Sequence, residues 1–295
     1  MTENLYNPHI SVDCVVFGFD GENMKVLLIE RSIDDQNELY NDKKLPGSII
    51  LYDEDLDDAA SRVLNELTGL KNIYLSQFKS FGSPTRTANP RDIVWLERTT
   101  QLKIGRIVTV AYVALIKIDR KIVFNAGDTS ASWYDVNEIA NMHLAFDHNT
   151  IIENGLQHIR HRLDLEPHLL FELLPRKFTI SQLRTLYDVI HQKKSDVRNF
   201  QKKVAQMPYL LMLDELEEGV PHRAARLYKF DKKKTWEVWE VWRVWRVWCL
   251  KFEEFEEFRV EWIVDWSLKI VIEIGCIVFS LKLKWHLTEI EMNTD

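Results

Sequence analysis

The sequence predicts an α+β chain made of two successive domains and an atypical tail. Three observations support this prediction. Strand-like alternation with short helices runs through residues 1–148, two capped helices and a hairpin occupy residues 149–231, and the composition changes in residues 232–295. With 46% hydrophobic and 28% charged residues, the 295-residue chain has an ordinary globular composition, which excludes a fully disordered protein.

We expect a cytoplasmic protein that has no membrane partner. Uncharged stretches such as residues 107–116 are about half of the ~18–20 residues that a membrane span needs. The first ten residues lack the basic and apolar regions of a secretion signal. Three scattered cysteines cannot form a disulfide framework, which agrees with a reducing compartment.

The first domain opens with a predicted β-hairpin, because residues 10–30 alternate in strand fashion around an Asp-Gly turn. Residues 45–50 predict another strand and turn. A helix follows over residues 57–67, where apolar side chains recur at helical spacing and Gly69 ends the helix. Two further strands and a short helix are predicted at residues 107–118, 121–124 and 136–142. These elements together indicate a mixed sandwich.

The predicted helix lies in a segment that resembles a known motif. Residues 45–70, LPGSIILYDEDLDDAASRVLNELTGL, resemble the Nudix box, whose pattern is G-x5-E-x7-R-E-U-x-E-E-x-G-U with U aliphatic. The matching positions are Glu54, Arg62 and Glu66, while Ser48 replaces the first glycine and Val63 and Leu67 replace glutamates. FGSPTR at residues 81–86 and GRIVTVAYVAL at residues 105–115 resemble the Nudix-related transcriptional regulators. The resemblance implies a Nudix-like α/β/α sandwich over residues 1–148.

The family's reaction cleaves nucleoside diphosphate derivatives with Mg²⁺ held by carboxylates on this helix. Magnesium needs hard oxygen ligands, and two of the three positions that share one helical face, Val63 and Leu67, are aliphatic here. Glu66 is spaced to pair with Arg62 instead. We therefore expect no catalytic residue, no metal and no cofactor, and a protein that is not an enzyme. The alternative is a magnesium-dependent hydrolase of ADP-ribose-type substrates that draws carboxylates from residues 53–58.

A Nudix fold without its metal face keeps a concave pocket, so ligand binding is the expected function of the first domain. Polar candidates for this pocket are Glu30, Tyr40, Lys44 and Arg86, each of which could equally be a solvated surface group. In the resembled family one branch senses ADP-ribose and another, of the arabinose-regulator type, senses a pentose. Val63 and Leu67 remove carboxylates that a diphosphate-bound metal would use, and this favours the pentose as effector.

A basic block occupies residues 176–203, which contain eight Lys and Arg residues and only two acidic residues, Asp188 and Asp196. Clustered basic charge on an acidic chain is typical of nucleic-acid binding, although a solvated helical surface explains it equally well. The block contains a capping box that starts at Thr179 and a helix that runs to His191.

A second helix is predicted to begin after Ser195 or Asp196 and to turn Val197, Phe200 and Val204 towards the core. Two short helices joined by a tight turn are typical of a helix-turn-helix. The candidate DNA contacts in and before the second helix are Lys194, Arg198, Asn199, Gln201 and Lys202.

A hairpin over residues 208–230 completes a predicted winged helix. Its returning strand carries His222, Arg223 and Arg226, which suit phosphate or minor-groove contact; alternatively the arginines cap the wing against the domain's own surface. The order of elements over residues 149–231 is that of the same regulator family. The resemblance implies a homodimer on palindromic double-stranded operator DNA, controlled by a small-molecule effector.

Residues 232–295 differ from the rest of the chain, since eight of the ten tryptophans fall there. Residues 236–248 read WEVWEVWRVWRVW. This period of three does not collect the tryptophans on one face, either of a helix or of a strand. We interpret the segment as a non-adapted extension and assign it no function. An aromatic interaction tail or an aggregation-prone set of strands is the alternative.

Overall fold

The computed structural model describes residues 5–35, 38–118, 130–219, 223–231 and 233–234. Residues 1–231 form one compact unit. The strand predicted at residues 121–124 and the tryptophan-rich repeat both lie outside the described residues. Among the described residues, no helix is both long and apolar enough to span a bilayer.

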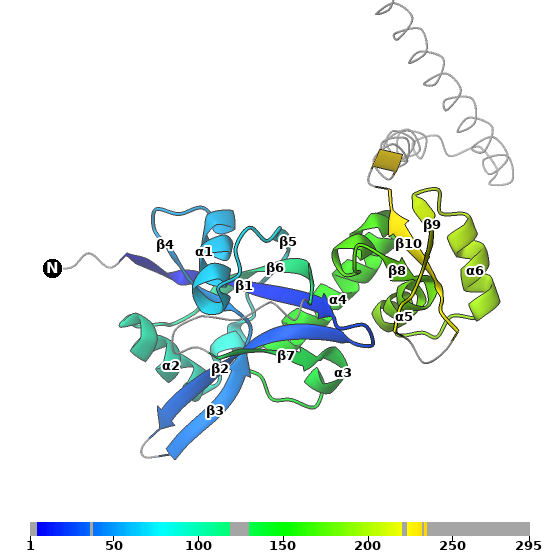
Figure 1. Cartoon of the computed structure of the whole chain (residues 1–295). Helices are drawn as coiled ribbons and strands as arrows, with labels where there is room; N and C mark the ends of the chain where they lie inside the picture. Colours follow the sequence, from blue (N-terminus) through cyan, green and yellow to red (C-terminus); the bar gives the residue numbers. More distant parts are fainter. Residues whose placement is uncertain (1–4, 36–37, 119–129, 220–222, 232, 235–295) are drawn as a thin grey trace, which may run out of the picture. The chain divides into compact units, whose positions relative to one another are not determined.

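A mixed sheet built around one long strand, β1 (Tyr6–Phe19), forms the centre of the first domain (Figure 1). The strand order is β3-β2-β1-β6-β5, with β4 paired to β1 and β7 to β2. The other strands are β2 (Met24–Asp35), β3 (Glu38–Lys44), β4 (Gly47–Leu51), β5 (Ser76–Phe81), β6 (Val108–Lys117) and β7 (Ala131–Asp135). The predicted hairpin is the antiparallel β1–β2 pair, whereas β6 runs parallel to β1.

Helices cover both faces of this sheet, which makes the α/β/α sandwich that the resemblance implied. Successive side chains of β1 point to opposite faces. Val12, Cys14 and Val16 pack in a core with α1 (Leu56–Thr68), and Val15 and Phe17 pack in a second core with α4 (His148–Leu165). The Asp55 side chain caps the start of α1, and Gly69 ends the helix in the left-handed conformation at φ 75°.

Several elements of the first domain were not predicted from the sequence: β3, β5, β7 and α2 (Pro90–Thr100). Helix α2 follows a 3-10 turn, η1 (Pro84–Thr87), and buries Leu96 in a small core with Ile49, Ile104 and Ile107. The short helix α3 (Val136–Ile139) ends three residues before the predicted limit at residue 142.

The second domain is a winged helix. After α4 and the 3-10 helix η2 (Pro167–Glu172), it contains β8 (Phe178–Thr179), α5 (Ile180–His191), α6 (Val197–Ala205), β9 (Leu210–Leu216) and β10 (Arg226–Phe230). The three strands form a sheet in the order β8-β10-β9. The capping box is present in full, with Thr179 and Gln182 each bonded to the other's backbone N–H.

Two details of this domain differ from the prediction. Val197 is 49% exposed rather than part of the core, because it is the first residue of α6 and the inward turn of the helix begins only at Phe200. The returning strand of the wing begins at Arg226, so Arg223 lies in the preceding loop.

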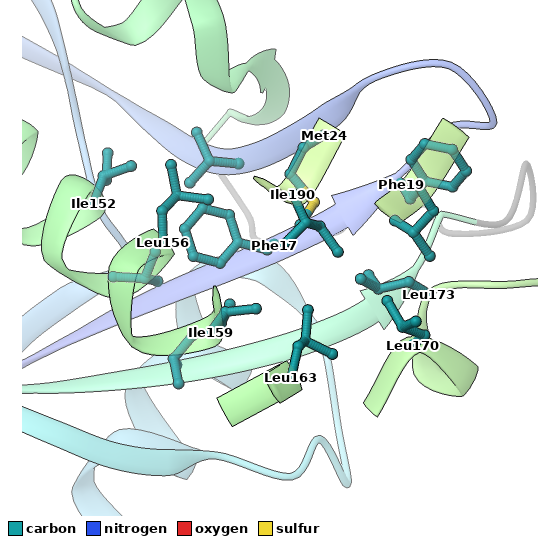
Figure 2. Packing of buried hydrophobic residues seen from close by; sticks show 14 of the residues in the cluster. Phe17, Phe19, Met24, Ile152, Leu156, Ile159, Leu163, Leu170, Leu173 and Ile190 are labelled. Carbon is teal, nitrogen blue, oxygen red and sulfur yellow. The ribbon is translucent and has the colours of Figure 1, made fainter. Parts of the chain in front are cut away.

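One apolar core joins the two domains. It contains Phe17 of β1 and Leu156 of α4 together with Leu183, Leu186 and Ile190 of α5. Figure 2 shows Ile190 in the same cluster as Phe17 and Met24. The winged helix therefore packs directly on the α4 side of the first domain's sheet.

Candidate ligand and DNA-binding sites

The helix face that carries metal ligands in the Nudix pattern does not fit a magnesium ion here. Val63 is fully buried in the core beneath α1, and Leu67 packs against the same core. The Glu66 carboxylate is 3.0 Å from Arg62 Nη1 in an i,i+4 ion pair. Across the described part of the chain, no three His, Cys, Asp or Glu side chains are placed to share a metal ion. Two of the three positions on this face thus offer no oxygen ligand, and the third is paired with an arginine.

The matching residues of the Nudix pattern stabilise the turn before α1. Glu54 accepts the Leu51 N–H at 2.7 Å and the Arg62 Nε–H at 2.8 Å. The hydrogen bond from Arg62 lowers the pKa of Glu54, more than its partial burial raises it. Arg62 and Glu54 therefore hold the β4–α1 loop against the helix.

A polar pocket of about 50 Å³ lies on the opposite face of β1. The direction of two neighbouring side chains shows this: Cys14 Sγ donates to the Ala60 carbonyl of α1, whereas Asp13 points away towards Arg86 and His148. The remaining lining residues include hydroxyl and aromatic side chains, among them Ser11, Ser48, Thr87, Trp95, Thr99, Thr100 and Phe146. The pocket is thus separated from α1 by the sheet.

Arg86 is the central cation of this pocket. Its Nη2 is 2.7 Å from Asp13 Oδ2, and its Nη1 contacts the Asp147 carboxylate. Burial raises the pKa of Asp13, but His148 and Arg86 outweigh this effect and hold the pKa well below its usual range. His148 accepts the Leu45 N–H at Nδ1, which leaves its Nε2 proton directed at Asp13, 3.5 Å away.

Lys44 is the second cation and is bound differently. Its Nζ donates to the Gly47 carbonyl at 2.7 Å and to the Leu45 carbonyl at 3.3 Å, and it forms no ion pair with any carboxylate of the described residues. Burial lowers the pKa of Lys44 to about 8. The Nζ also lies 5.3 Å from the centre of the Trp95 ring. Lys44 is therefore a buried positive charge that an anionic ligand could neutralise.

Position 47, beside the Asp13 carboxylate, requires glycine. A Cβ at Gly47 would lie 1.9 Å from Asp13 Oδ1, so any side chain there would displace Asp13.

A second buried ion cluster adjoins the pocket. Arg31 forms a bidentate pair with Asp42 and donates to Asp92 at 2.7 Å, and all three are nearly inaccessible. The guanidinium carbon of Arg31 lies 5.1 Å from the Trp95 ring centre and 5.5 Å from that of Phe146. The two clusters thus share their aromatic wall.

The four ligand candidates from the sequence have different positions. Lys44 and Arg86 both line the pocket. Glu30 does not line this pocket: it is exposed on β2 beside the Tyr134 hydroxyl, whereas the next residue, Arg31, is buried. Tyr40 pairs with Ile33 in the sheet, but its side chain lies outside the described residues.

Sequence reasoning missed Asp13, Arg31, Trp95 and His148. A signal existed for the first of these, because Asp13 is a single charge inside the apolar run SVDCVVF. A charge in a strand buried on both faces needs a partner, and such pairs collect at functional sites.

The candidate DNA surface is formed by α6. Asp196 caps this helix by accepting the Asn199 N–H at 2.9 Å. The predicted contact residues are all exposed: Lys194, Arg198, Asn199, Gln201 and Lys202. Lys203 is engaged within the domain, since its Nζ donates to the Tyr187 hydroxyl at 2.7 Å. The turn before α6 is held by Asp188, which accepts the Ser195 N–H at 2.9 Å. The two acidic residues of the basic block are therefore structural caps.

Two basic side chains at the wing have acidic partners. Arg226 lies 3.9 Å from Asp214 and donates to the Met212 sulfur, and Lys177 pairs with Glu215. Arg226 thus fits the alternative in which it caps the wing itself. Arg223 is exposed in the loop, and His222 lies outside the described residues.

Comparison with protein families agrees with this architecture. The NUDIX domain model matches residues 7–154, which is half of the chain, and the NrtR DNA-binding winged helix domain model matches residues 170–230. The "ADPR responsive transcriptional repressor NtrR" of Acinetobacter baylyi is 26% identical over 226 residues, covering 76% of this chain and 82% of that protein.

Solved structures are also similar. Shewanella oneidensis NrtR complexed with a 27mer DNA matches with a TM-score of 0.58 and 26% identity, over 77% of this chain and 95% of that chain. The same protein without DNA matches with a TM-score of 0.56 and 26% identity, over 75% of this chain and 94% of that chain. An Enterococcus faecalis MutT/nudix family protein, 24% identical with a TM-score of 0.53 over 76% of this chain and 87% of that chain, shares the fold. The chain therefore belongs to the NUDIX domain family, with a winged helix domain of the NrtR type as its second part.

Proposed function

We propose that this protein is a transcriptional repressor whose affinity for operator DNA is set by a small molecule bound in its Nudix domain. The observation that carries the proposal is the shared core: an exposed basic helix, α6, belongs to a domain that packs directly on the sheet bearing the polar pocket. The similarity to an ADPR-responsive repressor and to a DNA-bound NrtR supports both halves of the function. Coupling needs two sites and a ligand that favours one arrangement, and the two sites that we propose are the polar pocket and the exposed face of α6.

The proposed effector is ADP-ribose, and this corrects the preference for a pentose. The preference assumed that a diphosphate needs a metal on α1, but Lys44 and Arg86 provide positive charge on the other face of the sheet. Arginine and lysine bind diphosphates without a metal. Trp95 offers an aromatic surface next to Lys44 for the flat part of a nucleotide. The relative named for its response to ADPR supports the same choice.

We further propose that the effector is bound and not hydrolysed. Two carboxylates of residues 53–58, which the hydrolase alternative would need, have structural partners: Asp55 caps α1, and Asp57 accepts the Tyr112 hydroxyl at 2.6 Å. A magnesium-dependent rate on ADP-ribose that Glu66→Gln abolished would refute this part of the proposal.

The DNA function is tested by selecting duplexes from a random-sequence pool with the full chain. We expect enrichment of a palindrome, because we propose that the protein acts as a cytoplasmic homodimer with two α6 helices one helical turn of DNA apart. ADP-ribose should change the affinity for the selected duplex, while ribose and L-arabinose should not. Failure to enrich any sequence would exclude the regulator function, and a response to L-arabinose alone would exclude ADP-ribose.

A further inference from the structure

We propose that residues 145–148 form a strap that closes the effector pocket, and that the effector signals to DNA by displacing this strap and thereby moving α4 against α5. This inference rests on the proposed function and specifies how the same pocket is regulated.

The strap is tied to three elements around the pocket. The Ala145 N–H donates to the Lys43 carbonyl at 2.9 Å, and the Phe146 N–H donates to Asp92 Oδ2 of α2 at 3.0 Å. Asp147 binds Arg86, and His148 accepts the Leu45 N–H at 3.0 Å. Every residue of the strap therefore has a contact that an entering ligand could replace or break.

The strap is held in a strained form. Phe146 has φ 52°, in the left-handed region that is unfavourable for a residue with a bulky side chain. The centre of its ring lies 5.5 Å from the guanidinium carbon of Arg31 and 5.6 Å from that of Arg86. Burial also raises the pKa of Asp147, despite its arginine partner. The closed strap is thus maintained by contacts that compensate for its own conformational cost.

The pocket must open to hold a nucleotide. Its volume is about 50 Å³, whereas sites for ligands of nucleotide size occupy roughly 300–1,000 Å³. Phe146 and His148 are part of its wall. A diphosphate would compete with Asp147 for Arg86, since both are anions that suit the same guanidinium. The strap is therefore the wall that the effector is best suited to displace.

The strap leads directly into α4, because His148 is the first residue of this helix. Helix α4 has 18 residues and is about 27 Å long, so it transmits a movement of its first turn to its far end. Figure 2 shows Ile152, Leu156 and Ile159 along this helix, in the core that also holds Ile190 of α5.

Near its C-terminal end, α4 is hydrogen-bonded to α5 of the helix-turn-helix. Arg160 Nε donates to the Ile190 carbonyl at 2.5 Å, in the last turn of α5. Asp188 in the same turn holds the Ser195 N–H just before α6. A shift of Arg160 therefore reaches the start of the DNA-facing helix through one short connection.

The test uses the full chain with Arg160→Met, which keeps most of the apolar stem and removes the donor. Arg162→Met is the matched control, because Arg162 lies on the same helix and pairs with Glu166 at 2.8 Å in the adjoining turn. For each protein, operator affinity is measured with and without ADP-ribose, and ADP-ribose affinity is measured without DNA.

We expect Arg160→Met to bind operator and ADP-ribose each within about threefold of wild type, while the factor by which ADP-ribose changes operator affinity falls at least about fivefold towards one. Arg162→Met should keep the wild-type factor. An unchanged factor in Arg160→Met would overturn the proposal. A wild-type protein that shows no response to ADP-ribose would instead overturn the proposed function, so the two failures are distinguishable.

The strap itself is tested with Asp147→Ala. The Asp147 side chain makes no capping hydrogen bond to α4, and Arg86 keeps Asp13 as a partner, so the fold should be retained. We expect ADP-ribose to bind several-fold more tightly, because one anion no longer competes for Arg86. Unchanged or weaker binding by a variant that melts like wild type would show that the strap does not close the pocket.

Discussion

Arg62 and Arg86 each lie between two carboxylates, yet their surroundings give them different roles. The Arg62 side chain is 23% exposed and stabilises a loop through Glu54. The Arg86 side chain is only 4% exposed and lies in a polar pocket. Removing its charge and those of its carboxylate partners from water lowers the stability of the fold, so stability alone does not explain the cluster. Buried charges of this kind are typical of functional sites.

The loop contact predicts a difference between two glutamates of the Nudix pattern. Glu54→Gln should lower the free energy of unfolding by about 1–3 kcal/mol, because it removes a partly buried, charged acceptor. Glu66→Gln should cost about 0.5 kcal/mol or less, since its side chain is 55% exposed. The pKa of Glu54 is lowered on folding, so the wild-type advantage should be present above pH 4.5 and disappear as the pH falls. Urea titrations at neutral and acid pH measure both effects; equal costs at neutral pH would contradict this role of Glu54.

Lys44 predicts a pH dependence of effector binding. Its pKa of about 8 means that it is mostly charged at pH 7 and loses its proton as the pH rises above 8. ADP-ribose affinity should then fall by up to about tenfold per pH unit. Calorimetric titrations between pH 7 and 9 measure this fall, which Lys44→Met should not show. An equal pH dependence in the variant would place the titrating group elsewhere.

Gly47 predicts a steric effect on the pocket. Gly47→Ala should weaken ADP-ribose binding strongly and cost about 1–3 kcal/mol of stability, because the new Cβ would meet Asp13 Oδ1. Gly105→Ala is the control, since its Cβ would meet nothing within 4 Å. Thermal melts measure the stability of both variants, and titrations measure their ADP-ribose affinity. A Gly47→Ala protein that binds ADP-ribose normally would show that the position of Asp13 is not needed for binding.

At the scale of single elements, α6 separates a DNA-facing side from a core-facing side. Arg198→Ala should weaken operator binding and reduce its salt dependence without changing the melting temperature, because this side chain is exposed. Phe200→Ala should cost about 3–5 kcal/mol, since Phe200 is only 3% exposed. Salt titrations and thermal melts separate these effects. A collapse of the melting temperature in Arg198→Ala would mean that the helix is rotated from the orientation described.

Elements with strong local signals could be predicted from the sequence. The β1–β2 hairpin, α1 with its Gly69 end, and α5 with its capping box were predicted within a few residues. Strand β3, ELYNDKK, could not be, because it is polar: its buried Asp42 is paired with Arg31 of β2, and its buried Lys44 donates to the carbonyls of Leu45 and Gly47 just after the strand. Helix α2 was missed for a related reason, since its buried Asp92 pairs with Arg31 of β2, far away in sequence.

At the scale of the whole molecule, the candidate site was only half predictable. Lys44 and Arg86 were named from their residue types, but Asp13 and His148 are 135 positions apart in the numbering and meet only because α4 begins beside β1. The shared core between the domains was not predicted either, because the apolar stripes of α4 and α5 do not reveal which surface each one covers. Tertiary packing decides both features.

We propose that the pocket recognises its effector without consuming it and thereby controls DNA binding. The most direct test follows the fluorescence anisotropy of a labelled, selected duplex bound to the full chain, after ADP-ribose is added with Mg²⁺ present. We expect the anisotropy to drop and to stay low for hours, because the effector persists. An anisotropy that never changes, or that recovers as ADP-ribose is hydrolysed, would contradict the claim.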